Sequence, residues 1–114
     1  MSSFQSFVHE QLNRAVPPVR ARRMFGGMGL YSSDVFFALI ADDALYLKTN
    51  ASTQPDFEAK GMGPFRPFGD DGGTMGYHQL PEEVLEDPEE LRAWCEKSIA
   101  VARAARVKPK TRRK

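Results

Sequence analysis

The chain has 114 residues, of which 41% are hydrophobic and 27% charged, and it carries a single cysteine. This length and balance predict one soluble globular domain whose core is large enough to fold without disulfides or metals. One cysteine excludes an internal disulfide and fits a reducing compartment. We recognise neither a secretory signal nor an apolar run of membrane-spanning length, so we expect a cytoplasmic protein with no membrane partner.

The formal net charge of +1 is unevenly distributed along the chain. Residues 108–114 hold five of the sixteen basic side chains and no acidic one, which leaves a body with eleven basic and fifteen acidic groups. Broad phosphate-binding surfaces concentrate Lys and Arg. The mildly acidic body therefore argues against a surface of that kind.

Apolar residues near the N-terminus recur at helical spacing, namely Phe4, Phe7, Val8, Leu12 and Ala15. They predict an amphipathic helix over residues 2–15 whose apolar side packs on a sheet. Ser2 or Ser3 can cap this helix by accepting a hydrogen bond from a first-turn amide. Pro17-Pro18 ends it, because proline has no backbone N–H to donate.

Three short runs rich in aromatic and aliphatic residues follow, at 22–31, 35–41 and 44–50. Ser32-Ser33-Asp34 separates the first two runs and Asp42-Asp43 the last two. Such short polar side chains favour turns, because they bond to the local backbone. We predict a three-stranded antiparallel meander on which the rest of the chain packs.

Three glycines interrupt the first of these runs, at Gly26, Gly27 and Gly29. Glycine weakens a strand interior, so the three indicate a bulge, a sharp bend or the close approach of another backbone. We expect one bent strand that wraps over a helix. A phosphate-binding loop is rejected, because the segment lacks the Walker spacing and a following Lys-Ser or Lys-Thr pair, and it opens no helix.

Four arginines lie close together in the sequence, at Arg14, Arg20, Arg22 and Arg23. Most charge runs are solvated, and a contact with a small anion or nucleic acid is the functional alternative. Strand alternation sends Arg22 and Arg23 to opposite faces of a sheet. The arginines therefore do not obviously make one patch.

Residues 52–61 predict a short helix, with Ser52 or Thr53 as its cap, Phe57 as its core anchor and Gly61 at its end. Extended segments at 65–68 and 74–80 predict a second hairpin. Its first strand contains Pro67, which cannot donate to a sheet, so this strand should lie near an edge. The intervening pair Asp70-Asp71 has too few ligands for a calcium loop and fits a turn.

The clearest helix is predicted over residues 88–106. Asp87 offers a cap, Pro88 occupies the first helical position, and Glu90 follows the cap by three residues. Its apolar stripe consists of Leu91, Trp94, Cys95, Ser98, Ile99, Ala102 and Ala105. One extra helical turn is predicted at 80–85.

Together these elements predict a single two-layer α+β domain over residues 1–106. It should contain an antiparallel sheet of about five strands, made of the three-stranded meander plus the hairpin, with helices packed on one face. Residues 107–114 should form a disordered basic tail.

The segment Arg-Met-Phe-Gly-Gly-Met-Gly-Leu-Tyr at residues 23–31 carries a family signature. Further matching segments, in order and spacing, are Leu45–Lys48, Pro55-Asp56-Phe57, Gly61, Pro64-Phe65, Met75-Gly76-Tyr77, Leu80–Leu85 and Trp94. In these motifs the chain resembles the N-terminal domain of the TfoX/Sxy family, over residues 20–104.

The resemblance implies an α+β domain with an antiparallel sheet and helices on one face. It also implies a link to natural competence, in which full-length bacterial members act as transcription co-activators with the cyclic-AMP receptor protein. Those regulators carry a second, helical C-terminal domain, and this chain ends where that domain would begin, so we expect a stand-alone N-terminal domain. The resemblance implies no catalytic, cofactor or metal residues.

The residues themselves give little support to an enzyme. Cys95 lies on an apolar helix stripe, which is typical of a small core residue. His9 and His78 are far apart in the sequence, and metal-ligand spacings of the Cys-x-x-Cys or His-Glu-x-x-His type are absent. We therefore expect neither catalysis nor a cofactor; a small-ligand pocket around His78 or Cys95 is the remaining alternative.

Two binding functions stay open. The first is a regulatory protein-interaction module, whose partner belongs to the transcription machinery or is a second copy of the chain. Its candidate contact residues are Phe65, Phe68 and Tyr77, with core packing as the alternative for each. The second is a nucleic-acid-associated regulator that uses basic residues, namely Arg20, Arg22, Arg23, Lys108, Lys110, Arg112, Arg113 and Lys114.

Overall fold

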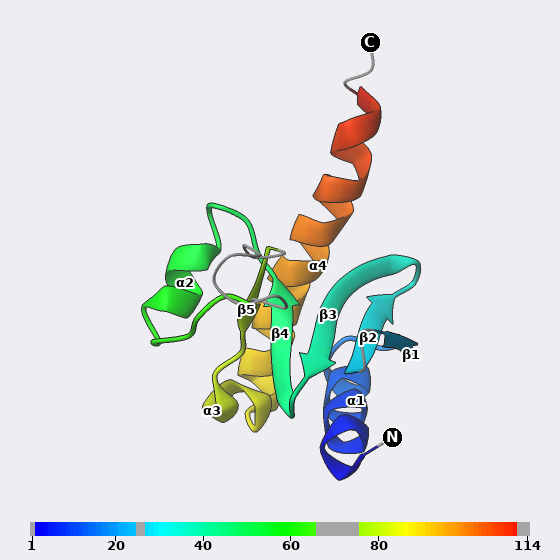
Figure 1. Cartoon of the computed structure of the whole chain (residues 1–114), viewed down its shortest axis with the longest axis vertical. Helices are drawn as coiled ribbons and strands as arrows, with labels where there is room; N and C mark the ends of the chain where they lie inside the picture. Colours follow the sequence, from blue (N-terminus) through cyan, green and yellow to red (C-terminus); the bar gives the residue numbers. More distant parts are fainter. Residues whose placement is uncertain (1, 25–26, 66–75, 112–114) are drawn as a thin grey trace.

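One antiparallel sheet, in which the strand order follows the chain order, forms the front layer of the molecule (Figure 1). The computed structural model describes residues 2–24, 27–65 and 76–111. The strands in these ranges are β1 (Val19–Met24), β2 (Gly27–Ser32), β3 (Val35–Ala41), β4 (Ala44–Lys48) and β5 (Tyr77–Gln79). The predicted α+β domain with an antiparallel sheet of about five strands is confirmed.

The first predicted strand is wrong in its outline, because residues 22–31 belong to two strands. β1 and β2 pair with each other, from Val19 opposite Ser32 to Met24 opposite Gly27. Close backbone approach explains Gly27, since a Cβ at this position would collide with the backbone oxygen of Ile40 in β3. The meander therefore contains four strands, and the bent strand expected to wrap over a helix is a hairpin.

The second predicted hairpin is seen in part. Phe65 donates its N–H to the carbonyl of Tyr77, at 2.8 Å, and Gln79 donates to the carbonyl of Gly63, at 3.0 Å. The segment before residue 66 therefore pairs with β5 at the outer edge of the sheet, next to an isolated bridge between Pro64 and His78. Residues 66–75, which include the predicted turn and Pro67, lie outside the described residues.

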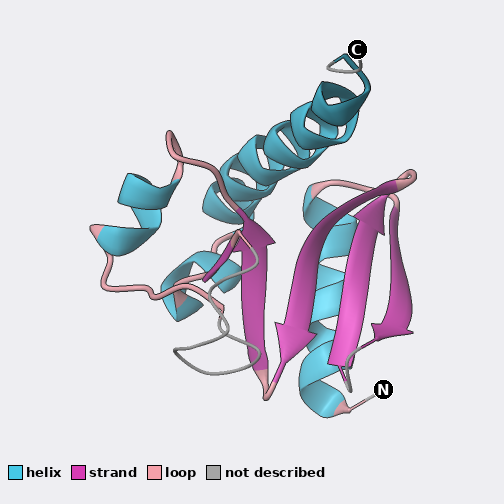
Figure 2. Ribbon diagram, turned by 45° about the horizontal axis from the view of Figure 1, so that its top comes forward, coloured by secondary structure: helices cyan, strands magenta, loops and turns pink. Residues whose placement is uncertain are grey.

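Two long helices, α1 (Ser3–Ala15) and α4 (Pro88–Thr111), pack against the back of the sheet (Figure 2). The cap of α1 is Ser2, which accepts from the Gln5 amide while the Gln5 side chain accepts from the Ser2 amide. Asp87 caps α4 by accepting from the amides of Glu89 and Glu90. No helix in these described ranges is long and apolar enough to cross a membrane.

The helix α4 ends later than predicted, at Thr111 instead of Arg106. The first residues of the predicted tail, Val-Lys-Pro-Lys-Thr at 107–111, extend α4. They include Pro109, which is unfavourable inside a helix, so their sequence does not explain the extension. The division into a domain at 1–106 and a disordered tail at 107–114 stays a prediction.

Two short helices flank the end of the sheet formed by β4 and β5: α2 (Gln54–Glu58) and α3 (Glu82–Leu85). Thr53 occupies the cap position of α2 but makes no side-chain cap bond. The Asn50 side chain instead accepts from the amides of Ser52 and Thr53. Gly61 closes this segment with a φ of 77°, a conformation that glycine adopts without strain.

The main core lies between the sheet and the two long helices. Strand residues such as Leu30, Phe37 and Leu47 have no exposed surface, and they share one cluster with Leu12 of α1 and Leu91 of α4. Burial of a large apolar side chain stabilises a fold by roughly 1.5–3 kcal/mol. This cluster therefore fixes which face of the sheet is covered and leaves the opposite face for other contacts.

Candidate interaction surface

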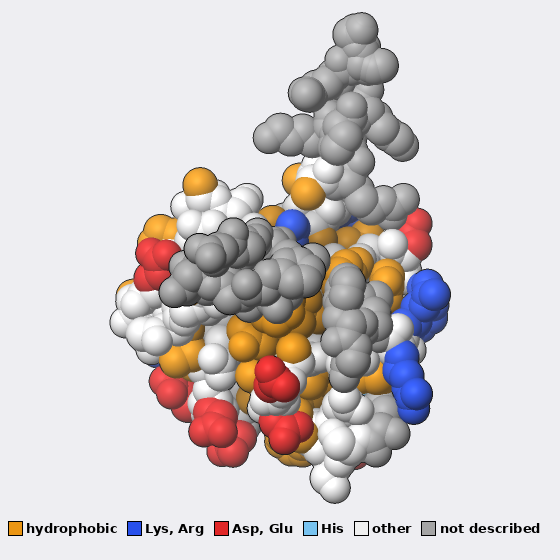
Figure 3. Space-filling model, viewed as in Figure 1, with side chains coloured by type: hydrophobic (Ala, Val, Ile, Leu, Met, Phe, Trp, Pro, Cys, Tyr) orange, Lys and Arg blue, Asp and Glu red, His pale blue; other side chains and the backbone are white. Residues whose placement is uncertain are grey.

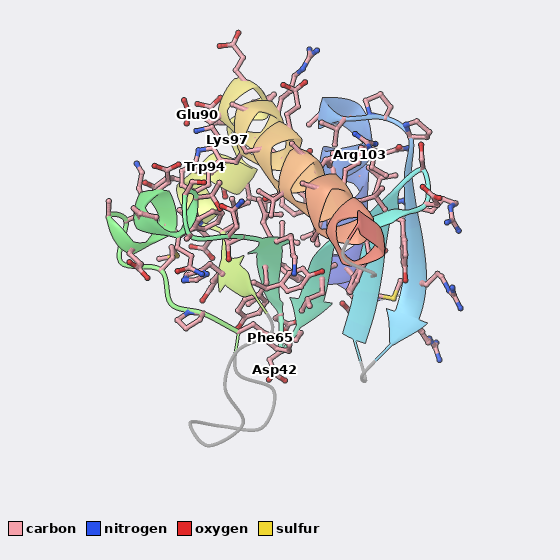
Figure 4. All side chains as sticks on the ribbon, turned by 90° about the horizontal axis from the view of Figure 1, so that it is seen from above. Asp42, Phe65, Glu90, Trp94, Lys97 and Arg103 are labelled. Carbon is pink, nitrogen blue, oxygen red and sulfur yellow. The ribbon has the colours of Figure 1, made fainter. Side chains whose placement is uncertain are left out.

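The front of the sheet carries a group of aromatic side chains, here called the aromatic face: Tyr31, Phe36, Tyr46, Phe65 and Tyr77. Successive strand residues point to opposite faces. Phe37, Leu45 and Leu47 join the helix-side core, and their neighbours Phe36 and Tyr46 consequently project forward. Figure 4 shows Phe65 on the side of the sheet opposite to α4.

Ring contacts connect these residues across several strands. Tyr31 stacks on Phe36 with 5.2 Å between centroids, and Phe36 contacts Tyr77 at 5.5 Å. Tyr46 contacts Phe65 at 4.8 Å. Each aromatic pair contributes about 0.5–1.5 kcal/mol beyond its burial. The rings therefore form a structured surface that links β2, β3, β4 and β5.

Burial divides the aromatic face into a base and an accessible part. Tyr77 is 4% exposed and Phe65 is 9% exposed, and both pack with the buried Leu39 in a second hydrophobic cluster. Tyr31, Phe36 and Tyr46 are only half-buried. The predicted contact residues Phe65 and Tyr77 thus lie on this face but support it from within, whereas the three half-buried rings offer surface to a partner.

Basic side chains border the aromatic face. Arg20 lies over the ring of Tyr31, with its guanidinium carbon 5.3 Å from the centroid, and donates to the carbonyl of Ser33 at 3.2 Å. The Lys48 ammonium lies 5.1 Å from the centroid of Tyr77. Exposed cation–π contacts contribute about 0.5–1 kcal/mol. In Figure 3, hydrophobic side chains occupy the centre of this view and basic side chains lie along one side.

The structure brings only some of the predicted basic residues to this surface. Arg20 and Arg22 alternate with Val19 and Ala21, which pack into the helix-side core, so they face forward. Arg23 faces the other way. Lys108 and Lys110 belong to the last turns of α4, but their side chains lie outside the described residues, as do Phe68, Arg112, Arg113 and Lys114.

Sequence reasoning missed Tyr31, Phe36, Tyr46 and Lys48. The signal that could have found them is the period-2 alternation within each run, which places these residues between core positions. The single bent strand predicted for residues 22–31 concealed the relation between Arg20 and Tyr31. These two residues are directly opposite each other in the β1–β2 hairpin.

Burial is the main reason why the hydroxyls of Tyr46 and Tyr77 stay neutral. Burial, and secondarily Tyr31, raises the pKa of Tyr77. Burial, and secondarily the charge of Asp42, raises the pKa of Tyr46. Both hydroxyls therefore stay protonated well above neutral pH and can donate hydrogen bonds; Tyr77 donates a long one, of 3.5 Å, to the carbonyl of Phe36.

The histidine and cysteine considered for chemistry are buried on the other side of the sheet. His78 is 3% exposed; its Nδ1 shares a hydrogen bond of 3.0 Å with the Thr49 hydroxyl, and its Nε2 lies 3.7 Å from a Glu58 oxygen. A nucleophile needs access to substrate, and Thr49 is itself 4% exposed. This group therefore satisfies buried polar atoms, and neither His78 nor Cys95 lines any of three cavities walled by described residues.

Cys95 should be inert toward thiol reagents in the native protein. It has no exposed surface, and burial, with a smaller contribution from Glu96, raises the pKa of its thiol from 9.0 to about 12. Because the thiolate is the reactive form, three pKa units lower its amount near pH 8 by about a thousandfold. We expect the native chain to react with an aromatic disulfide reagent only after it unfolds. Its labelling rate should be at least about a thousandfold lower than that of the chain unfolded in urea. Rapid labelling of the native chain would show that Cys95 is accessible.

Metal-ligating residues do not gather in the described part of the chain. No group of three His, Cys, Asp or Glu side chains there is arranged to hold a metal ion. The predicted pair Asp70-Asp71 lies outside the described residues.

Comparison with known proteins gives the family. The family model of the TfoX N-terminal domain matches residues 10–102, which include β1 to β5 and the packed part of α4. DNA transformation protein TfoX1 of Aliivibrio fischeri is similar to the chain, with 28% identity over 86 residues. That alignment covers 75% of this chain and 41% of the relative, so the chain spans less than half of the relative's length. The resemblance inferred from residues 23–31 is confirmed. The chain belongs to the TfoX N-terminal domain family.

Proposed function

We propose that this chain is a non-enzymatic regulatory module that takes part in the control of DNA transformation by binding a partner protein through its aromatic face. Membership of the TfoX N-terminal domain family supports the regulatory setting. The name of the similar Aliivibrio fischeri protein, a DNA transformation protein, supports the process. We place the partner in the transcription machinery and the complex in the cytoplasm.

The observation that carries the proposal is the connected ring path from Arg20 through Tyr31 and Phe36 to Tyr77 and Lys48. Aromatic residues and arginine are enriched at the energetic centres of protein interfaces. The buried base of Phe65 and Tyr77 holds the half-buried rings in place, so less conformational entropy is lost when a partner binds.

The edge strand β1 is a less suitable site for the partner. It carries Arg20, Arg22 and Arg23, and charged side chains on an edge disfavour the addition of a strand from another chain. A homodimer through the aromatic face is the alternative to a different protein. Light scattering at several concentrations decides between a monomer and a homodimer.

Removing two accessible rings should weaken the regulatory effect more than it weakens the fold. We choose the double variant Tyr31→Thr and Phe36→Thr, because threonine favours strands but lacks the aromatic surface. With interface rings contributing about 1–3 kcal/mol, partner affinity should fall at least about tenfold. Transformation frequency in the native host should fall with it at equal protein abundance. Phe7→Gln, on the exposed side of α1, is the control and should leave the frequency unchanged.

An unchanged transformation frequency in the folded double variant would contradict this proposal. Thermal unfolding and immunoblotting must accompany the assay, because the Tyr31 and Phe36 rings contact each other and their loss also lowers stability. The matched variant Tyr31→Phe and Phe36→Tyr keeps both rings. It should retain the wild-type transformation frequency. This variant therefore shows whether the loss of the rings, and not the change of residues as such, causes the effect.

A nucleic-acid partner is the second candidate, favoured by the cations Arg20 and Lys48 beside aromatic rings. Bases stack on such rings, and phosphate contacts make binding depend steeply on salt. Fluorescence anisotropy with a labelled single-stranded oligonucleotide tests it. Salt-dependent binding that disappears when the five basic residues of 108–114 become glutamine would assign the association to the tail instead of the aromatic face.

A further inference from the structure

A cavity between α2 and α4 lies on the helix side of the molecule, away from the aromatic face. Its volume is about 390 Å³, within the usual range of small-molecule sites. Figure 4 shows Glu90, Trp94 and Lys97 on the part of α4 that faces α2, with Phe65 on the far side of the sheet. The cavity is therefore separate from the proposed protein-binding surface, and a ligand could occupy it whether or not a partner binds the aromatic face.

Two aromatic rings form the apolar wall of this cavity. Phe57 is 3% exposed, and Trp94 packs edge-on against it with 4.7 Å between centroids and 86° between planes. The Trp94 ring is fixed further because its Nε1 donates to Glu90 at 3.3 Å. Ser98, which is 2% exposed, also lines the cavity. The wall thus offers an apolar group the contact of two fixed aromatic rings, and Ser98 lies beside them.

Charges of both signs lie at the mouth of the cavity. Lys97 of α4 forms an ion pair with Asp56 of α2, with 3.5 Å between Nζ and Oδ2, and the side chains of the two residues are 65% and 51% exposed. Lys60 and Glu90 also line the cavity. Exposed pairs of this kind contribute little to stability, about 0–1 kcal/mol. Lys97 and Asp56 can therefore leave each other and pair with the charged groups of a ligand at small cost.

We propose that this cavity binds a zwitterionic amino acid with an aromatic side chain. The ring of the ligand lies against Phe57 and Trp94, its carboxylate pairs with Lys97, and its ammonium pairs with Asp56. The match is one of charge and shape, since an apolar wall stands beside one cation and one anion already 3.5 Å apart. A ligand with a single charge would leave one member of the pair without its partner.

The chain supplies its own reporter for this site, because Trp94 is its single tryptophan. L-phenylalanine does not absorb at wavelengths that excite only tryptophan, so titration of the purified chain should give a saturable change in Trp94 emission. A ligand of this size implies a Kd of about 0.1–1 mM. Isothermal titration calorimetry on the same samples should give the same constant.

Single-charge analogues test the assignment of each group. 2-Phenylethylamine lacks the carboxylate and 3-phenylpropionate lacks the ammonium, and each should bind up to about fivefold more weakly than L-phenylalanine. Lys97→Gln should remove the preference over 2-phenylethylamine, while Asp56→Asn should remove the preference over 3-phenylpropionate. The control is Arg92→Gln with Glu96→Gln, an exposed ion pair on the same helix that should leave binding unchanged.

Three results would overturn the proposal. One is the absence of any saturable change up to about 10 mM L-phenylalanine, ten times the weakest expected Kd. Another is equal binding of the two single-charge analogues and L-phenylalanine. The third is equal binding of N-acetyl-phenylalanine amide, which carries no charge and would identify the cavity as a receptor for an aromatic side chain of a partner polypeptide.

Discussion

Replacing Phe37 with alanine should lower the free energy of unfolding by about 3–5 kcal/mol. The ring has no exposed surface and belongs to the core cluster between the sheet and the two long helices. The substitution removes the burial of the ring and leaves a cavity that neighbouring strands can fill only in part. Since small domains are stable by about 5–15 kcal/mol, this loss is a large share of the total.

Urea unfolding followed by Trp94 fluorescence and circular dichroism measures this loss. Phe7→Ala is the matched control, because Phe7 is the same residue type but is 41% exposed. A surface change of that kind should alter the free energy of unfolding by about 0.5 kcal/mol. Similar losses for Phe7→Ala and Phe37→Ala would mean that the core does not lie between the sheet and the helices.

Replacing Gly27 with alanine should lower the free energy of unfolding by about 2–4 kcal/mol. Gly27 is the first residue of β2, and the backbone of β3 passes it so closely that an added Cβ would collide with the Ile40 carbonyl oxygen. That oxygen belongs to the backbone, so relief requires β2 and β3 to move apart. The sheet pairing between these strands would weaken with it.

Gly63→Ala tests whether the effect at Gly27 comes from this close approach. A Cβ at Gly63 would meet no atom within 4 Å, so its cost should be about 0.5 kcal/mol or less. Chemical denaturation of the two variants gives the comparison directly. An equally mild effect at Gly27 would show that β2 and β3 do not approach each other so closely.

The strands β3, β4 and β5 and the two long helices could be predicted from the sequence because their signals are local. Runs of aromatic and aliphatic residues indicate strands, and Asp87-Pro88 followed by an apolar stripe indicates a helix. The glycines were ambiguous, since a bulge, a bend and a close approach all favour the same residue. The structure shows that the reason at Gly27 is the close approach of the β3 backbone at Ile40.

The candidate sites were harder to predict because their residues meet only through the tertiary fold. Phe36 and Tyr77 are 41 positions apart, as are Asp56 and Lys97. Arg20 and Tyr31 share a contact only because residues 22–31 form a hairpin and not one strand. Local patterns therefore located the surfaces of single elements, while register and helix packing determine which of those surfaces combine.

Photo-crosslinking from the aromatic face tests the central claim most directly. p-Benzoylphenylalanine in place of Tyr46 keeps an aromatic ring at a half-buried position, and the same residue in place of Phe7 on α1 is the control. After irradiation in the native host, the Tyr46 position should yield a discrete protein adduct that survives nuclease treatment and is absent from the Phe7 position. An adduct that nuclease removes, or identical adducts at both positions, would contradict a protein partner on this face.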